Sequence, residues 1–278
     1  MDSPGVGTPA QPGLVQRLQG RIRLTWAGPS TTCNGVTPLE FAIILAIGLV
    51  AGTISGIVGF GSSIMLMPVL VLFFGPLQAV PIMAVAALMA NLSRIMVWWR
   101  EIDWRATAVY SATGIPAAAL GARTLLTLPP RIMEGALGVF FLLMIPARRL
   151  LMAHNLRLRL WHLAVVGAFI GFLTGIVVST GPINTPFFLA YGLVKGAFLA
   201  TEAAGSLAVY LTKALVFRSF GALPVEAIAK GLIIGSSLMA GSFLAKRFVL
   251  KLDAEHFRVL MDGLLLLSGL TMLWAAFA

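Results

Sequence analysis

The chain has 278 residues, of which 59% are hydrophobic and only 11% are charged, whereas a soluble domain carries about 45–50% apolar and about 25% charged residues. This excess of apolar side chains cannot be hidden in one water-soluble core, so the composition excludes a soluble enzyme, a disordered regulator and a coiled coil. The formal charge of +10 comes from 20 Lys and Arg against 10 Asp and Glu. Because the bases lie mostly between apolar runs, they indicate membrane orientation, and no nucleic-acid partner is expected.

The chain opens on a polar segment, residues 1–38, which is rich in Gly and Pro and is expected to be a disordered tail. Cys33, the only cysteine, lies within it. A single cysteine excludes an intramolecular disulfide framework, an iron–sulfur site and a cysteine-based zinc site. The sequence predicts neither a metal nor a cofactor.

Apolar runs fill the rest of the chain, and a spanning helix needs about 20 apolar residues, with a range of about 17–25. The runs of sufficient length are 39–58, 79–99, 106–126, 161–178, 197–217, 225–244 and 257–277. The run 132–145 is a plausible eighth span. Two further runs, 64–74 and 186–193, are too short to cross and are expected to be half-helices or re-entrant pieces. The sequence therefore predicts an all-α polytopic membrane protein, placed in the cell membrane with the lipid bilayer as its partner.

The two short runs occupy matching places in an internal repeat. Glycines at 48, 52 and 56 recur at 167, 171 and 175, a constant offset of 119. After a one-residue slip, an offset of 118 pairs Pro68 with Pro186. We therefore expect two repeated halves, residues 39–150 and 160–278, each with about four apolar units.

The orientation of the two halves stays open between two topologies. If the first run and the short run of each half form a hairpin that enters and leaves one face, the halves are inverted. If the two runs form one broken span, the halves are parallel. Loop bases fit both topologies equally. Inversion is preferred because it lets two Gly-rich loops face each other near the midplane, whereas the three arginines of the tail favour a cytoplasmic N-terminus and so the parallel arrangement.

Stretches rich in Gly, Ser and Pro follow both glycine ladders, over residues 56–68 and 175–186. They cannot remain regular helix at low cost, and their freed backbone groups need partners. Paired interrupted segments are typical of a transporter's substrate site, and the N-termini of half-helices suit an anion. The ladders themselves have a simpler interpretation, since small residues allow helices to pack closely in lipid.

Candidate substrate-binding residues lie in these broken segments and on the helices that follow them. They are Ser55, Gly59, Gly61, Ser62, Ser63, Asn91, Arg94, Thr174, Ser179, Thr180, Gly181, Asn184 and Lys213. Their hydroxyl, amide and backbone N–H groups can bind the oxygens of a substrate, or can satisfy the freed backbone. No catalytic residue is predicted.

Two bases and one acid fall well inside predicted spans. Arg94 and Lys213 lie six and five residues before Arg100 and Arg218, which mark the ends of their runs, so they either snorkel to the interface or face a central path. If neutral donors make up the binding site, both bases would instead attract the anion as it approaches. Glu202 lies six residues into the run 197–217 and is a candidate for proton coupling. The alternative is that Glu202 pairs with Lys195.

The broken segment of the first half carries a family resemblance. The stretch GTISGIVGFGSSIMLMPVL, residues 52–70, resembles the signature of the sulfite exporter TauE/SafE family, as do the duplicated halves and the total size. The resemblance covers about residues 40–278. It implies a secondary permease for a small sulfur-containing anion such as sulfite, a sulfonate or sulfoacetate, and it is compatible with a homo-oligomer.

The glycine-rich loop that typifies the family is only partly kept. In the first half the chain retains Gly59, Gly61 and Pro68, with Ser62 and Ser63 at glycine positions. In the second half the chain retains Gly181, Pro182 and Pro186, with Val177, Ser179 and Thr180 where glycines are usual. These departures bear on the particular substrate more than on the family.

Two other classes of function compete with a transporter. An intramembrane hydrolase is disfavoured because no Ser–His pair is evident and no His-Glu-x-x-His motif occurs. A membrane scaffold subunit has no need of Gly/Ser-rich breaks at repeat-related positions. The sequence therefore favours transport of a small anion.

Overall fold

The computed structural model describes residues 38–127, 158–177 and 180–245, with four isolated positions between the first two ranges. Every regular element in these ranges is helical, which confirms the predicted all-helical class. Residues 1–37 of the tail, most of the run 132–145, the run 257–277, and Ser179 lie outside the described residues.

In chain order, the helices are α2 (Pro38–Val58), α3 (Ser62–Trp98), the single turn η1 (Trp99–Glu101), α4 (Trp104–Thr127), α6 (Leu160–Ile176), α7 (Gly181–Ala190), α8 (Lys195–Ser219) and α9 (Val225–Ala245). Within the described part of the chain, three stretches are long and apolar enough to cross a membrane: Pro38–Ile57, Leu77–Glu101 and Val225–Ala245. The predicted runs in α4, α6 and α8 are also helical, but they fall below that standard of length or apolarity.

The short run 64–74 is the first part of α3, which breaks at Gly75. This residue has a φ of +72° inside the helix, a conformation that glycine adopts at no steric cost. The break separates a short apolar piece, Ser62–Gly75, from the long stretch that begins at Leu77. In the second part of the chain, the run 186–193 begins inside α7, which is only ten residues long.

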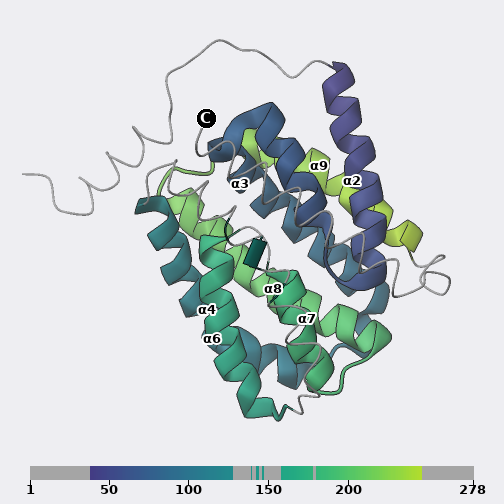
Figure 1. Cartoon of the computed structure of the whole chain (residues 1–278), viewed down its shortest axis with the longest axis vertical. Coiled ribbons are helices and arrows are strands. Elements are labelled where there is room, and N and C mark those ends of the chain that lie inside the picture. Colours follow the sequence, from purple (N-terminus) through teal and green to yellow (C-terminus); the bar gives the residue numbers. More distant parts are fainter. Residues whose placement is uncertain are drawn as a thin grey trace, which may run out of the picture.

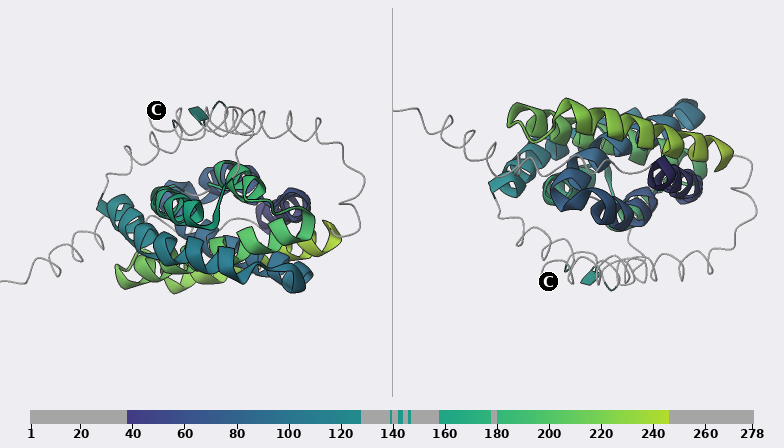
Figure 2. Two further views of the ribbon diagram at one scale, coloured as in Figure 1. Left: turned by 90° about the horizontal axis from the view of Figure 1, so that it is seen from below. Right: turned by 90° about the horizontal axis from the view of Figure 1, so that it is seen from above.

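Both glycine ladders make close helix contacts. A methyl group on Gly52 would overlap the backbone of Leu238 in α9, and one on Gly171 would overlap the backbone of Gly114 in α4. The other ladder glycines, at 48, 56, 167 and 175, are equally tight against the same two helices. The packing interpretation of the ladders is therefore confirmed. As Figures 1 and 2 show, α2 lies beside α9 on one flank, and α4 lies beside α6 on the other.

The order of these contacts gives the helix directions. Gly48, Gly52 and Gly56 meet successively later residues of α9, so α2 and α9 are parallel, and the second ladder makes α6 parallel to α4 in the same way. Gly231 and Gly235 of α9 meet successively later residues in the second part of α3, which is therefore parallel to α9.

The second part of α3 and α8 run in opposite directions. Gly196, at the start of α8, contacts Trp98 at the end of α3, whereas Glu202, further along α8, pairs with Arg94. Since α8 is parallel to α4, through contacts of Gly205 and Gly114, the helices form two sets. One set is α2, the second part of α3 and α9, and the other is α4, α6 and α8, with the opposite direction.

Each short helix returns towards the start of the helix before it. The backbone N–H of Leu158, just before α6, donates to the carbonyl oxygen of Ala190 at the end of α7, at 3.0 Å. Lys230, in the early part of α9, lies 4.9 Å from the ring centroid of Phe74. Phe74, at the end of the first part of α3, therefore lies near the start of α9. Because α2 is parallel to α9 and packs beside it, the first part of α3 also ends near the level at which α2 begins. The two loops between these helix pairs therefore lie inside the bundle.

Candidate functional site

The site is built where the two interrupted segments meet. Between α2 and α3, Gly59 and Gly61 have φ values of +91° and +110°, which L side chains rarely adopt. Between α6 and α7, Gly181 packs directly on the side chain of Phe60. The two loops thus touch each other. A bulky side chain at Gly59 or at Gly181 would displace the neighbouring side chains.

A cavity of about 30 Å³ lies between these loops, α3 and α8, which is room for the centres of about two water molecules. It is lined by ten predicted residues: Ser55, Gly59, Gly61, Ser62, Ser63, Asn91, Arg94, Thr180, Gly181 and Glu202. The structure therefore brings together predicted residues that lie far apart in the sequence, from Ser55 in α2 to Glu202 in α8.

Five residues of the cavity wall were not predicted from the sequence: Phe60, Ala87, Ala90, Ser206 and Tyr210. Helical spacing could have found two of them. Ser206 and Tyr210 follow Glu202 at intervals of four residues, so all three share one face of α8.

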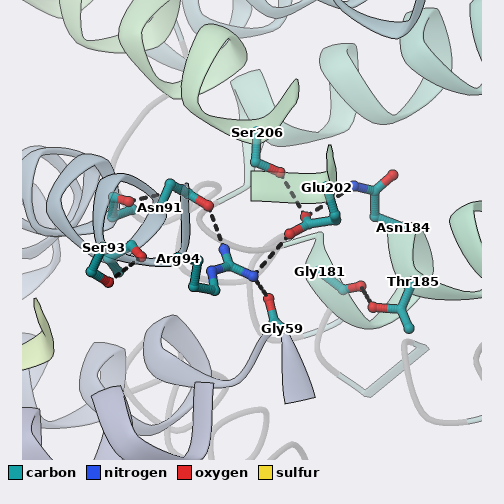
Figure 3. A network of polar contacts seen from close by, with 11 residues as sticks. Gly59, Asn91, Ser93, Arg94, Gly181, Asn184, Thr185, Glu202 and Ser206 are labelled. Carbon is teal, nitrogen blue, oxygen red and sulfur yellow. Dashed lines mark hydrogen bonds and ion pairs between the residues drawn. The ribbon is translucent and has the colours of Figure 1, made fainter. Parts of the chain in front are cut away.

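An ion pair between Arg94 and Glu202 forms one side of the cavity (Figure 3). Arg94 Nη1 donates to Glu202 Oε2 at 2.9 Å and to the carbonyl oxygen of Gly59, and Arg94 Nη2 donates to Asn91 Oδ1. The two side chains are only 7% and 3% exposed. The snorkelling interpretation of Arg94 is therefore wrong, because the guanidinium bonds inward to α8 and to the broken end of α2.

Glu202 is held by neutral donors as well as by the arginine. Its Oε1 accepts a hydrogen bond from Ser206 Oγ at 2.7 Å and another from Asn184 Nδ2 at 3.1 Å. The carboxylate therefore connects α3, α7 and α8. The alternative partner from the sequence, Lys195, has a side chain outside the described part of the chain, and the ion pair that the structure shows is with Arg94.

Lys213 occupies a different place from Arg94. It is 1% exposed, so it does not snorkel, and its Nζ donates to the carbonyl oxygens of Thr174 at 2.9 Å and Val177 at 2.8 Å. These carbonyls lie at the C-terminal end of α6, where the helix dipole favours a cation. Lys213 thus caps the broken end of α6, much as Arg94 binds the carbonyl of Gly59 after α2.

Three predicted residues lie beside the cavity rather than on its wall: Thr174, Asn184 and Lys213. Thr174 reaches the wall through the hydroxyl of Thr180, at an Oγ1–Oγ1 distance of 2.6 Å, and Asn184 reaches it through Glu202. Their predicted role in substrate binding remains a prediction.

Two hydrogen-bond donors on cavity-lining residues lack an acceptor in the described part of the chain. They are Ser55 Oγ and Arg94 Nε, both buried. The N-cap residues of helices α3 and α7, Gly61 and Thr180, also lie here, and the structure shows no side-chain cap at either of these two helix starts. The first N–H groups of a helix have no acceptor within the helix and form its positive end. Such a set of donors is suited to an oxyanion.

The described residues include no group of three or more His, Cys, Asp or Glu side chains that could hold a metal ion. What the cavity offers is a buried cation, a carboxylate and neutral donors.

Comparison with known proteins agrees with this arrangement. The family model for "Sulfite exporter TauE/SafE" matches residues 44–272, most of the chain. The chain belongs to the TauE/SafE family. It is also 31% identical over 194 residues to "Probable membrane transporter protein y4hK" of Sinorhizobium fredii, a match that covers 63% of this chain and 73% of that protein. No solved structure gives a significant match.

Membership in the TauE/SafE family confirms the resemblance found in the sequence and identifies the chain as a member of a membrane transporter family. The three apolar helices of spanning length agree with a place in the membrane. The interrupted stretch 52–70, which carried the resemblance, contributes Ser55 and the residues from Gly59 to Ser63 to the cavity wall.

Proposed function

We propose that this TauE/SafE protein is a secondary permease of the cell membrane that moves a small oxyanion, sulfite or an organosulfonate, through the cavity between its two interrupted segments. The observation that carries the proposal is that two residues lining that cavity, Ser55 and Arg94, carry buried donors, Oγ and Nε, that have no partner among the described residues. The family's name supports the sulfur class of the anion. The relative named as a membrane transporter supports transport.

The electrostatics of the cavity support a weakly held anion. In the empty cavity the charge of Arg94 is balanced by Glu202, so this pair leaves no excess positive charge there. The starts of α3 and α7 add the positive ends of two helix dipoles. This arrangement differs from a site of purely neutral donors with Arg94 at its approach, because Arg94 lies in the cavity wall itself. An anion bound in this way can also be released.

The helix directions support inverted repeats. At the repeat offset, α2 corresponds to α6, the second part of α3 to α8, and α4 to α9, and the members of each pair belong to sets of opposite direction. Each half would then begin with a hairpin and bring its loop to the middle, as inverted-repeat transporters do.

Single-cysteine labelling tests this topology. In a Cys33→Ser background, Leu39→Cys at the start of α2 and Arg159→Cys just before α6, both at exposed positions, should react with a membrane-impermeant reagent from opposite sides. Trp104→Cys and Val225→Cys, also exposed, are matched controls, since α4 begins at the level of α6 and α9 at the level of α2. Labelling of Leu39→Cys and Arg159→Cys from the same side would rule out inversion.

Removing an unpartnered donor tests the site. Ser55→Ala should weaken anion binding by about 1 kcal/mol, or roughly fivefold, the usual worth of one hydrogen bond, without loss of thermal stability because Ser55 Oγ has no partner among the residues that the structure describes. Calorimetric titration of the purified protein with methanesulfonate measures the change. Ser236→Ala, at an exposed position of α9, is the matched control. Equal affinities for the two variants would remove Ser55 from the site.

A further inference from the structure

We propose that Glu202 couples the anion to a proton: the Glu202 carboxylate and the substrate anion compete for Arg94, so the anion binds when Glu202 has taken up one proton. This inference rests on the proposed function and adds the coupling ion and its site. It assigns Arg94 two alternating partners, Glu202 in the empty state and the substrate anion in the loaded state.

The space beside Arg94 supports competition rather than simultaneous binding. The cavity of about 30 Å³ holds the centres of about two waters, so a group with three oxygens around sulfur would lie directly against the Arg94 and Glu202 side chains that line it. The Glu202 carboxylate, 2.9 Å from Arg94 Nη1, occupies the position that an anion oxygen needs on that edge of the guanidinium. A substrate anion therefore displaces the carboxylate in order to accept a hydrogen bond from Arg94 Nη1.

Electrostatics decides when displacement is possible. The groups that face Glu202 are Arg94 from α3, Tyr110 from α4, Asn184 from α7, and Ser206 and Tyr210 from α8. Arg94 is the cation among them. With Glu202 ionised, an incoming anion would leave a carboxylate buried without its counter-ion, which is costly. With Glu202 protonated, the charges of Arg94, Glu202 and the anion add to zero once a monovalent anion has bound.

The neighbours of Glu202 can accommodate the added proton. The proton adds to Oε2, the atom that faces Arg94, and no other bond forms or breaks. Ser206 can continue to donate to Oε1. Asn184 Oδ1 is a buried acceptor without a partner, and rotation of this amide would offer it to the new O–H group. One proton therefore enters and leaves with each anion, which makes the transport a symport.

The wild-type protein provides the first test. Methanesulfonate is a suitable probe because its sulfonate stays ionised over the range studied. Titrated calorimetrically into the purified full-length protein from about pH 5 to about pH 8, it should show a dissociation constant that rises about tenfold per pH unit once Glu202 is mostly ionised in the empty protein. Repeating the titration in buffers of different ionisation enthalpy should show uptake of one proton per anion.

A variant of Glu202 provides the second test. Glu202→Gln should bind methanesulfonate with an affinity that does not change with pH, and in proteoliposomes it should exchange the anion without acceleration by a proton gradient. The matched control is Glu226→Gln, which removes an exposed acid whose partner, Lys230, lies one turn away at 2.6 Å. This control should keep the wild-type pH dependence.

The outcomes separate the coupling from the function. A wild-type affinity that is flat with pH, or a Glu202→Gln variant that keeps the wild-type slope and proton uptake, overturns the coupling and leaves the permease intact. Failure of the wild-type protein to bind methanesulfonate, sulfite or sulfate at any pH overturns the proposed function and this inference with it. If Glu202→Gln cannot be purified, the wild-type slope and proton count decide alone.

Discussion

Arg94→Gln is expected to abolish anion transport and to cost about 3–5 kcal/mol of stability. It removes the cation of a buried ion pair and leaves Glu202 without its counter-ion, the situation in which such losses are largest. It also removes the donor to the carbonyl oxygen of Gly59, at the broken end of α2. Uptake into proteoliposomes measures the first effect, and the thermal unfolding midpoint in detergent measures the second.

The double variant Arg94→Gln/Glu202→Gln separates the two effects. Neutralising both partners removes the unpaired charge, so the double variant should recover much of the lost stability, with a coupling energy of at least about 1 kcal/mol in the double-mutant cycle. It should still fail to transport, because the guanidinium donors are missing. Wild-type flux in Arg94→Gln would show that the arginine only supports the fold.

Leucine at Gly61 or Gly181 is expected to abolish transport while the protein still inserts and purifies. At Gly61 the φ of +110° strains any L side chain, and the added bulk would fall at the start of α3 in the cavity wall. At Gly181 even a methyl group meets the side chain of Phe60. Methanesulfonate flux and binding should both fall below detection, because the bulk occupies a space sized for about two waters.

The matched control for backbone strain is Gly192→Ala. Gly192 has a φ of +105° but nothing within 4 Å of an added Cβ, and it lies in the exposed turn after α7. The Gly192→Ala substitution places an L side chain in the left-handed conformation at a site away from the cavity, so transport should continue. If Gly181→Leu transported as well as Gly192→Ala, the loop contact would serve packing alone.

Much of the framework could be predicted because it follows from composition and periodicity. Apolar runs of spanning length indicated the helical class, and the glycine ladders pointed to close packing. What the ladders could not reveal is their partner. Gly52 packs on Leu238 and Gly171 on Gly114, each in the other predicted half, and a small residue carries no information about which helix approaches it.

The candidate site was predicted as a set of residues but not as a geometry. The loop glycines and hydroxyls were found because a cluster of Gly, Ser and Pro conflicts with an apolar helix. The partners of the charged groups were not found. Arg94 and Glu202 are 108 positions apart, and only the antiparallel packing of α3 and α8 brings them together. Arg94 and Lys213 looked alike in sequence, yet one lines the cavity and the other caps α6.

The cavity between the two interrupted segments is the proposed route of a small oxyanion across the membrane. Uptake of labelled methanesulfonate into proteoliposomes tests this route, with sulfite as competitor and Gly181→Leu as the blocked control. We expect saturable uptake that sulfite inhibits and that the variant lacks. Protein that moves neither anion, yet moves a neutral or cationic solute, would contradict the proposed function.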